Sequence, residues 1–105
     1  MTNTFEIKAI NPGYTKAWHK LYKLDRQYSD LLDTHQRILD EKCHADEDFE
    51  YSTKGERLVE RHEMKEEALL ERAVGIADEM PKRELLAFER EYNRVHGYES
   101  YAVAL

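Results

Sequence analysis

Apolar residues recur at helical spacing through residues 15–43, and this segment constrains the fold more than any other part of the chain. The recurring positions are Ala17, Leu21, Leu24, Tyr28, Leu31, His35 and Ile38. Steps of three and four residues place these side chains in one stripe along an α-helix. A helix of this length is about 40 Å long, more than a small core can cover. We therefore expect it to need a partner: the next helix of the chain, a second copy, or another protein.

Two further helical patterns follow this segment. Thr53 and Glu56 fit a capping box, and apolar residues then return at helical spacing as far as Met80. Pro81 starts a new segment, which Gly97 can end in the left-handed conformation. We predict helices over residues 14–43, 53–79 and 81–96, with the first two antiparallel and the third closing one end. The first helix can be capped by Thr15, or by Asn11 with Pro12 at the first helical position.

The two ends of the chain have the alternating pattern of short extended segments. Phe5, Ile7 and Ala9 alternate with polar residues near the start, and Tyr101, Val103 and Leu105 alternate in the tail. The two ends can pair as a small two-stranded patch, or the tail can lie in an apolar groove. The predicted fold is a single all-α domain over residues 1–105, a three-helix arrangement built on a long helical hairpin with short extended N- and C-terminal segments.

Charge and composition exclude several classes of protein. The net charge is −6, with the acidity concentrated in the middle third, which argues against direct binding to nucleic acid. No apolar run is long enough for a membrane span, and the start of the chain does not have the pattern of a signal peptide. The single Cys43 suits a reducing compartment. We expect a cytoplasmic protein that does not bind membranes.

Metal binding is the main chemical alternative that the sequence offers. Glu41 and His44 have the E-x-x-H spacing of di-iron bundles, and His62 could add a ligand. Those sites need two such steps and further carboxylates, whereas this chain has one step. A solvated acidic loop is the simpler interpretation, and we expect no cofactor. His35 lies in the apolar stripe, so we interpret it as a hydrogen-bonded residue between helices rather than a catalytic base.

No catalytic motif stands out, so we expect no enzymatic activity and predict an interaction protein. Such a protein would be an adaptor or stoichiometric inhibitor of a larger host or cellular assembly, as small accessory and viral proteins often are. We expect a homodimer or a hetero-complex. The apolar anchors would be Trp18, Tyr22 and Tyr28. The electrostatic guide would be an acidic face that can imitate nucleic acid or simply serve solubility: Asp46, Glu47, Asp48, Glu50, Glu56, Glu60, Glu63 and Glu67. The alternative is a metal-dependent enzyme or metal sensor that uses Glu41, His44 and His62.

Overall fold

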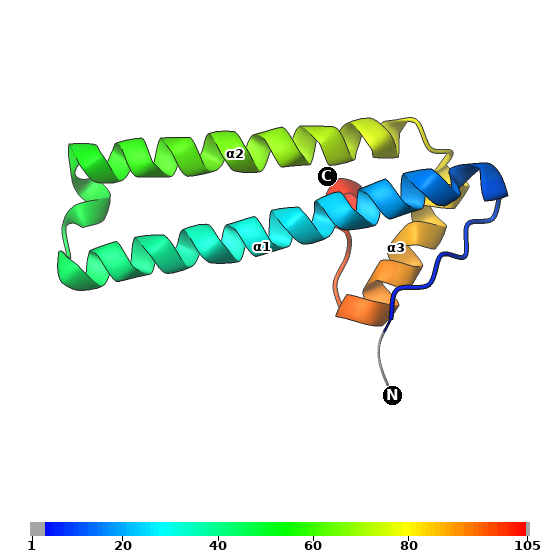
Figure 1. Ribbon diagram of the computed structural model, residues 1–105, viewed down its shortest axis with the longest axis horizontal. Coiled ribbons are helices and arrows are strands. Elements are labelled where there is room, and N and C mark those ends of the chain that lie inside the picture. Colours follow the sequence, from blue (N-terminus) through cyan, green and yellow to red (C-terminus); the bar gives the residue numbers. More distant parts are fainter. Residues whose placement is uncertain (1–3, 105) are drawn as a thin grey trace.

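The computed structural model describes residues 4–104, and within that range it is helical with no strand. Two long antiparallel helices form a hairpin, and α3 crosses it at one end, as the sequence predicts (Figure 1). The short helix α4 contacts α1, α2 and α3. The elements are η1 (Pro12–Tyr14), α1 (Thr15–Ala45), η2 (Phe49–Tyr51), α2 (Thr53–Asp78), α3 (Lys82–His96) and α4 (Tyr101–Ala104).

Local sequence signals set the helix ends. Asn11 caps the first helical turn by accepting a hydrogen bond from the Gly13 amide at 2.9 Å, so the second of the two capping options is confirmed. The cap of α2 is Ser52, whose hydroxyl accepts from the Gly55 amide at 3.1 Å. The prediction of a capping box at Thr53 was therefore wrong by one residue. Gly97, with φ of 72°, ends α3 as predicted.

Within residues 4–103, the buried apolar side chains lie at one end of the hairpin. This end, which we call the head, comprises residues 4–29 and 73–104. Trp18 packs edge-on against Phe88, with ring centroids 5.5 Å apart. The rest of the core closes around this pair, because the start of α1, the end of α2 and both C-terminal helices meet here. The buried apolar residues are Trp18, Leu21, Ala73, Ala77, Met80, Phe88, Tyr92 and Ala102.

The N-terminal segment is extended and alternates as predicted, with Phe5, Ile7 and Ala9 packed on the core. No strand pairs with it among the described residues, so the first of the two alternatives for the chain ends, the two-stranded patch, is wrong. Two buried carboxylates of α3 take the place of a strand. Glu84 accepts from the Ile10 amide at 3.3 Å, and Glu91 accepts from the Glu6 amide at 3.1 Å. Side chains thus take up two of the backbone donors of the segment that a strand would otherwise bind.

The C-terminal segment was predicted to be extended, but residues 101–104 form the helix α4. Its position depends on a buried polar contact, because the Ser100 hydroxyl donates to the carboxylate of Asp25. Burial raises the pKa of Asp25 to about 6, against the lowering effect of the Ser100 hydrogen bond. Leu105, part of the predicted alternation, lies outside the described residues.

The remainder of the hairpin, residues 30–72, projects from the head, and we call it the arm (Figure 1). All of its residues are described, and only His35 and Gly55 are buried. The large aliphatic side chains between its two helices are half-buried: Leu31, Leu32, Ile38, Leu39, Leu58, Val59, Leu69 and Leu70. The arm therefore has apolar surface but no core of its own.

We predict opposite effects of Gly→Ala at the two helical glycines of α2. A Cβ on Gly55 would stand 1.9 Å from the carbonyl oxygen of Phe49, whereas a Cβ on Gly75 would meet nothing within 4 Å. Gly55→Ala should lower the free energy of unfolding by about 1–3 kcal/mol, because backbone must move. Gly75→Ala should raise it by about 0.5–1 kcal/mol through helix propensity. Urea denaturation measures both, and a gain at Gly55 would contradict the close packing of η2 on α2.

Candidate functional site

Trp18, the first of the predicted partner anchors, lies inside the head. It is 0% exposed, and its indole nitrogen donates to Glu84 at 3.1 Å. This hydrogen bond satisfies the one polar atom of the ring, so both the ring and its N–H make their contacts inside the head. Trp18 offers no surface to a partner, and we withdraw it as an anchor.

Tyr22 and Tyr28 are half-buried and also pack within the head. Tyr22 stacks on Phe5 with ring centroids 4.1 Å apart, and its hydroxyl hydrogen-bonds to His96 at 2.9 Å. Tyr28 meets Tyr101 of α4 edge-on at 4.8 Å. Both rings therefore join elements of the same chain.

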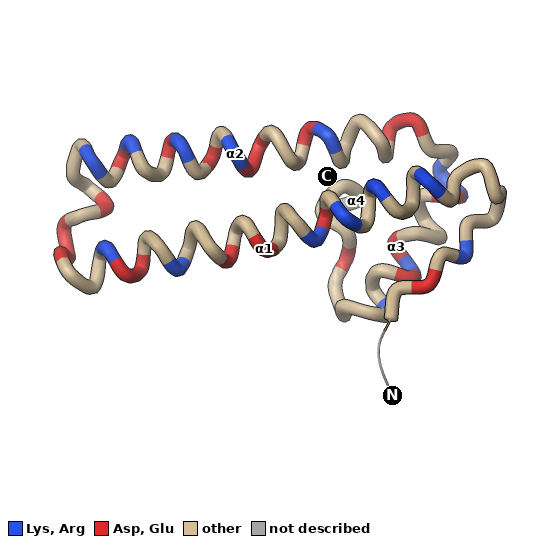
Figure 2. The backbone as a smooth tube through the Cα atoms, viewed as in Figure 1, with Lys and Arg blue, Asp and Glu red and all other residues tan. Residues whose placement is uncertain are grey.

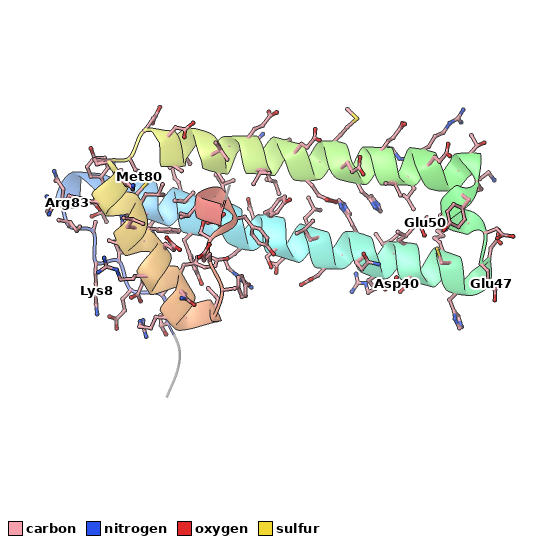
Figure 3. All side chains as sticks on the ribbon, turned by 180° about the vertical axis from the view of Figure 1, so that it is seen from behind. Lys8, Asp40, Glu47, Glu50, Met80 and Arg83 are labelled. Carbon is pink, nitrogen blue, oxygen red and sulfur yellow. The ribbon has the colours of Figure 1, made fainter. Side chains whose placement is uncertain are left out.

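The predicted acidic residues are all exposed, but they do not form one uniform face. Glu47 and Glu50 lie at the turn of the hairpin (Figure 3). Along α2 the acidic residues share one stripe, which we call the acidic stripe, while cations occupy a different side of the helix. Figure 2 shows both signs alternating along α2. The acidic stripe consists of Glu56, Glu60, Glu63 and Glu67, and the cations on the other side are Lys54, Arg57, Arg61, Lys65 and Arg72.

The three residues of the metal-dependent alternative do not form a ligand set. Glu41 and His44 are exposed near the end of α1, and His62 lies between the helices. Over residues 4–104, no three His, Cys, Asp or Glu side chains are placed to hold a metal ion. The E-x-x-H spacing therefore has no second element to complete it.

The middle of the arm holds a pair of stacked histidines. The rings of His35 and His62 are 3.7 Å apart at an interplanar angle of 2°. Glu66 lies 2.7 Å from Nδ1 of His35, which confirms His35 as a hydrogen-bonded residue between helices. These three side chains line an open groove of about 420 Å³ together with aliphatic and polar neighbours. We call it the seam groove, and its other lining residues are Leu32, Asp33, Gln36 and Leu39.

The stack is sensitive to protonation. Desolvation lowers the pKa of His62, and the neighbouring His35 lowers it further, against the opposing effect of Glu66. Two charged imidazoles face to face would repel each other. The pair is therefore most stable with at least one neutral ring.

A second cluster, at the turn of the hairpin, was missed by the sequence analysis. Lys42 at the end of α1 meets cations from the start of α2 around the apolar side chains of Phe49 and Leu58. These residues line an open hollow of about 360 Å³, which we call the tip hollow. The spacing of the α2 cations at three and four residues was the available signal, but it does not reveal that Lys42 joins them. The four cations are Lys42, Lys54, Arg57 and Arg61.

Comparison with known protein families, curated proteins and solved structures found no match. Among the helices of residues 4–104, none combines the length and apolar character that crossing a bilayer requires. Among residues 4–104, the arm is the part where the two long helices have no buried apolar core, so its surface is the candidate interaction site.

We predict that the histidine stack makes stability depend on pH. Because the pKa of His62 is lowered on folding, the unfolded chain binds more protons below about pH 6.5, and stability falls as the pH drops through that value. His62→Gln should flatten this fall, measured as the free energy of unfolding between pH 7 and pH 5. His44→Gln, at an exposed position, should keep the wild-type slope. Equal slopes for wild type and His62→Gln would contradict the stack as its cause.

Proposed function

We propose that this chain is a non-enzymatic interaction protein, an adaptor or stoichiometric inhibitor, that binds a partner protein through its arm. The observation that carries the proposal is the placement of the core. Every buried apolar residue described lies in the head, while the aliphatic side chains of the arm stay half-buried. A two-helix layer with such a seam is usually covered by further helices. A partner helix laid in the seam groove would supply that cover.

The polar residues of the seam groove support a specific rather than a purely apolar contact. His35 and Glu66 are already paired with each other, so a partner need not satisfy them. Leu32 and Leu39 stand one helical repeat of seven residues apart on the same side of α1, which suits the spacing of anchors along a partner helix. The groove therefore combines apolar anchor points with a fixed polar centre.

The acidic stripe supports electrostatic steering toward a basic surface of the partner. Its four glutamates are exposed, and none forms an ion pair with another described residue. Exposed, unpaired charges of one sign act mainly on the rate of association. The cations on the other side of α2 argue against imitation of nucleic acid, whose charge has one sign throughout.

The partner in this proposal is a different protein of a larger assembly. Sedimentation of the purified chain separates this from a homodimer: a monomer at micromolar concentration supports the hetero-complex. A dimer that Leu39→Asp dissociates would instead make a second copy the occupant of the groove.

The head needs no partner to complete its apolar core, since Trp18 packs on Phe88 and Glu84 is hydrogen-bonded within the chain. Two buried atoms of the head, Asp25 Oδ1 and the Tyr92 hydroxyl oxygen, have no hydrogen-bond partner among the described residues.

We predict that the seam groove, and not the head, is required for partner binding. Crosslinking in the cells that make the protein should join wild type to a defined partner. Leu39→Asp and Gln36→Arg, both in the groove, should reduce that crosslink about tenfold or more, because a charge enters the apolar contact. Leu86→Asp, at an exposed apolar position on α3, is the matched control and should retain it.

The acidic stripe is tested with the same partner once it is identified. Reversal to Lys at Glu56, Glu60 and Glu63 should slow association and flatten its salt dependence, with little change in the dissociation rate. An unchanged association rate would remove the steering role.

For the seam groove, two results would contradict binding through the arm. One is loss of the crosslink with Leu86→Asp, and the other is its retention with both groove variants.

A further inference from the structure

The tip hollow gathers positive charge in a chain whose net charge is −6. Phe49 and Leu58 are half-buried and supply apolar surface, while the four cations around them are exposed. None of these cations forms an ion pair or a side-chain hydrogen bond with any residue from 4 to 104. Acidic residues are abundant in the turn and in α2. The lack of ion pairs with these four cations among residues 4–104 therefore results from the directions in which the helices project their side chains.

The three cations of α2 at the tip hollow do not stabilise the helix that carries them, whereas Lys42 lies in the last turn of α1, where the helix dipole favours a cation. Lys54 and Arg57 lie in the first two turns of α2, where the helix dipole is positive and favours acidic side chains. Arg61 lies one turn after Arg57 on the same side, so their like charges repel. An anion in the hollow would relieve both effects. The hollow is thus electrostatically complementary to a negatively charged ligand with an apolar part.

We propose that the tip hollow binds an acidic segment of a partner protein, in which an apolar side chain is flanked by carboxylates. The apolar side chain would rest on Phe49 and Leu58. The guanidinium groups of Arg57 and Arg61 would each donate two hydrogen bonds to a carboxylate, in the bidentate geometry that arginine favours. This inference deepens the proposed function, because it names the chemistry of the partner at a second contact on the arm.

A short acidic peptide fits the surroundings better than nucleic acid does. Exposed carboxylates flank the lining residues of the hollow in the sequence. They are Glu47, Asp48 and Glu50 around Phe49, and Glu56 directly before Arg57. A continuous phosphate backbone that leaves the hollow would meet these carboxylates and be repelled. A peptide needs only two to four negative charges at the hollow and can be neutral or basic beyond it.

The test is direct binding of a fluorescently labelled peptide, Glu-Asp-Phe-Asp-Glu, to the full chain, followed by anisotropy. We expect saturable binding that Arg57→Glu with Arg61→Glu weakens about tenfold or more. The matched control is Lys16→Glu with Lys20→Glu, which changes the net charge equally, at the same spacing, on exposed positions of the head. This control should retain binding to within about twofold. Replacement of the peptide's Phe by Ser should also weaken binding, and this needs no change in the protein.

Three results would overturn the inference. The first is an equal loss of binding in both double variants, which would indicate charge attraction without a site. The second is tighter binding of a thymidine oligonucleotide of equal charge than of the peptide. The third is self-association in sedimentation that Arg57→Glu with Arg61→Glu abolishes, since the occupant would then be a second copy. Leu39→Asp leaves the tip hollow intact, so this variant should bind the peptide as the wild type does. A failure of the tip-hollow proposal is therefore distinguishable from a failure of the proposal that a partner binds the seam groove.

Discussion

The packing of Trp18 against Phe88 decides where this protein has a core. The two ring centroids are 5.5 Å apart, and the indole nitrogen donates a hydrogen bond to Glu84. Glu84 also fixes the N-terminal segment through the Ile10 amide, so one carboxylate links three parts of the chain. Because a buried carboxylate is stable only when its oxygens are hydrogen-bonded, these contacts support one another. These contacts together stabilise the head, and none of them involves a residue of the arm.

The arm consists of the same two long helices that enter the head, but the side chains between its helices differ in polarity and burial from those of the head. Along α1 the buried positions of the head change from Trp18 and Leu21 to Asp25 and Ser29, and His35 is the one buried position of α1 in the arm. The buried side chains thus change from apolar to polar toward the arm, where the aliphatic side chains stay half-buried. Polar contacts contribute only modestly to stability in water, so the two helices of the arm are held less firmly. A surface of this kind gains most from a partner, and both the seam groove and the tip hollow lie on it.

The sequence predicted the helical hairpin, its third helix and the ends at Pro81 and Gly97, because helical period and glycine or proline chemistry are local properties. It did not predict which end of the hairpin is covered. That depends on α3 and α4 folding back, which is decided by pairs as distant as Asp25 and Ser100. The placement of the aromatic residues held a usable signal: between residues 29 and 87 only Phe49 and Tyr51 are aromatic. The tip hollow could not be predicted, since Lys42 joins it only through the geometry of the turn.

Amide hydrogen exchange of the isolated chain, resolved by residue, tests most directly whether the arm lacks a core of its own. Amides of residues 31–39 and 58–70 should exchange through local openings that cost less free energy than global unfolding. Amides of residues 18–28 and 85–95 should exchange only through global unfolding, because they surround the aromatic core. Uniform protection along α1 from the head to the turn would contradict the claim that the arm lacks a core, since the arm would then be as stable as the head without any partner.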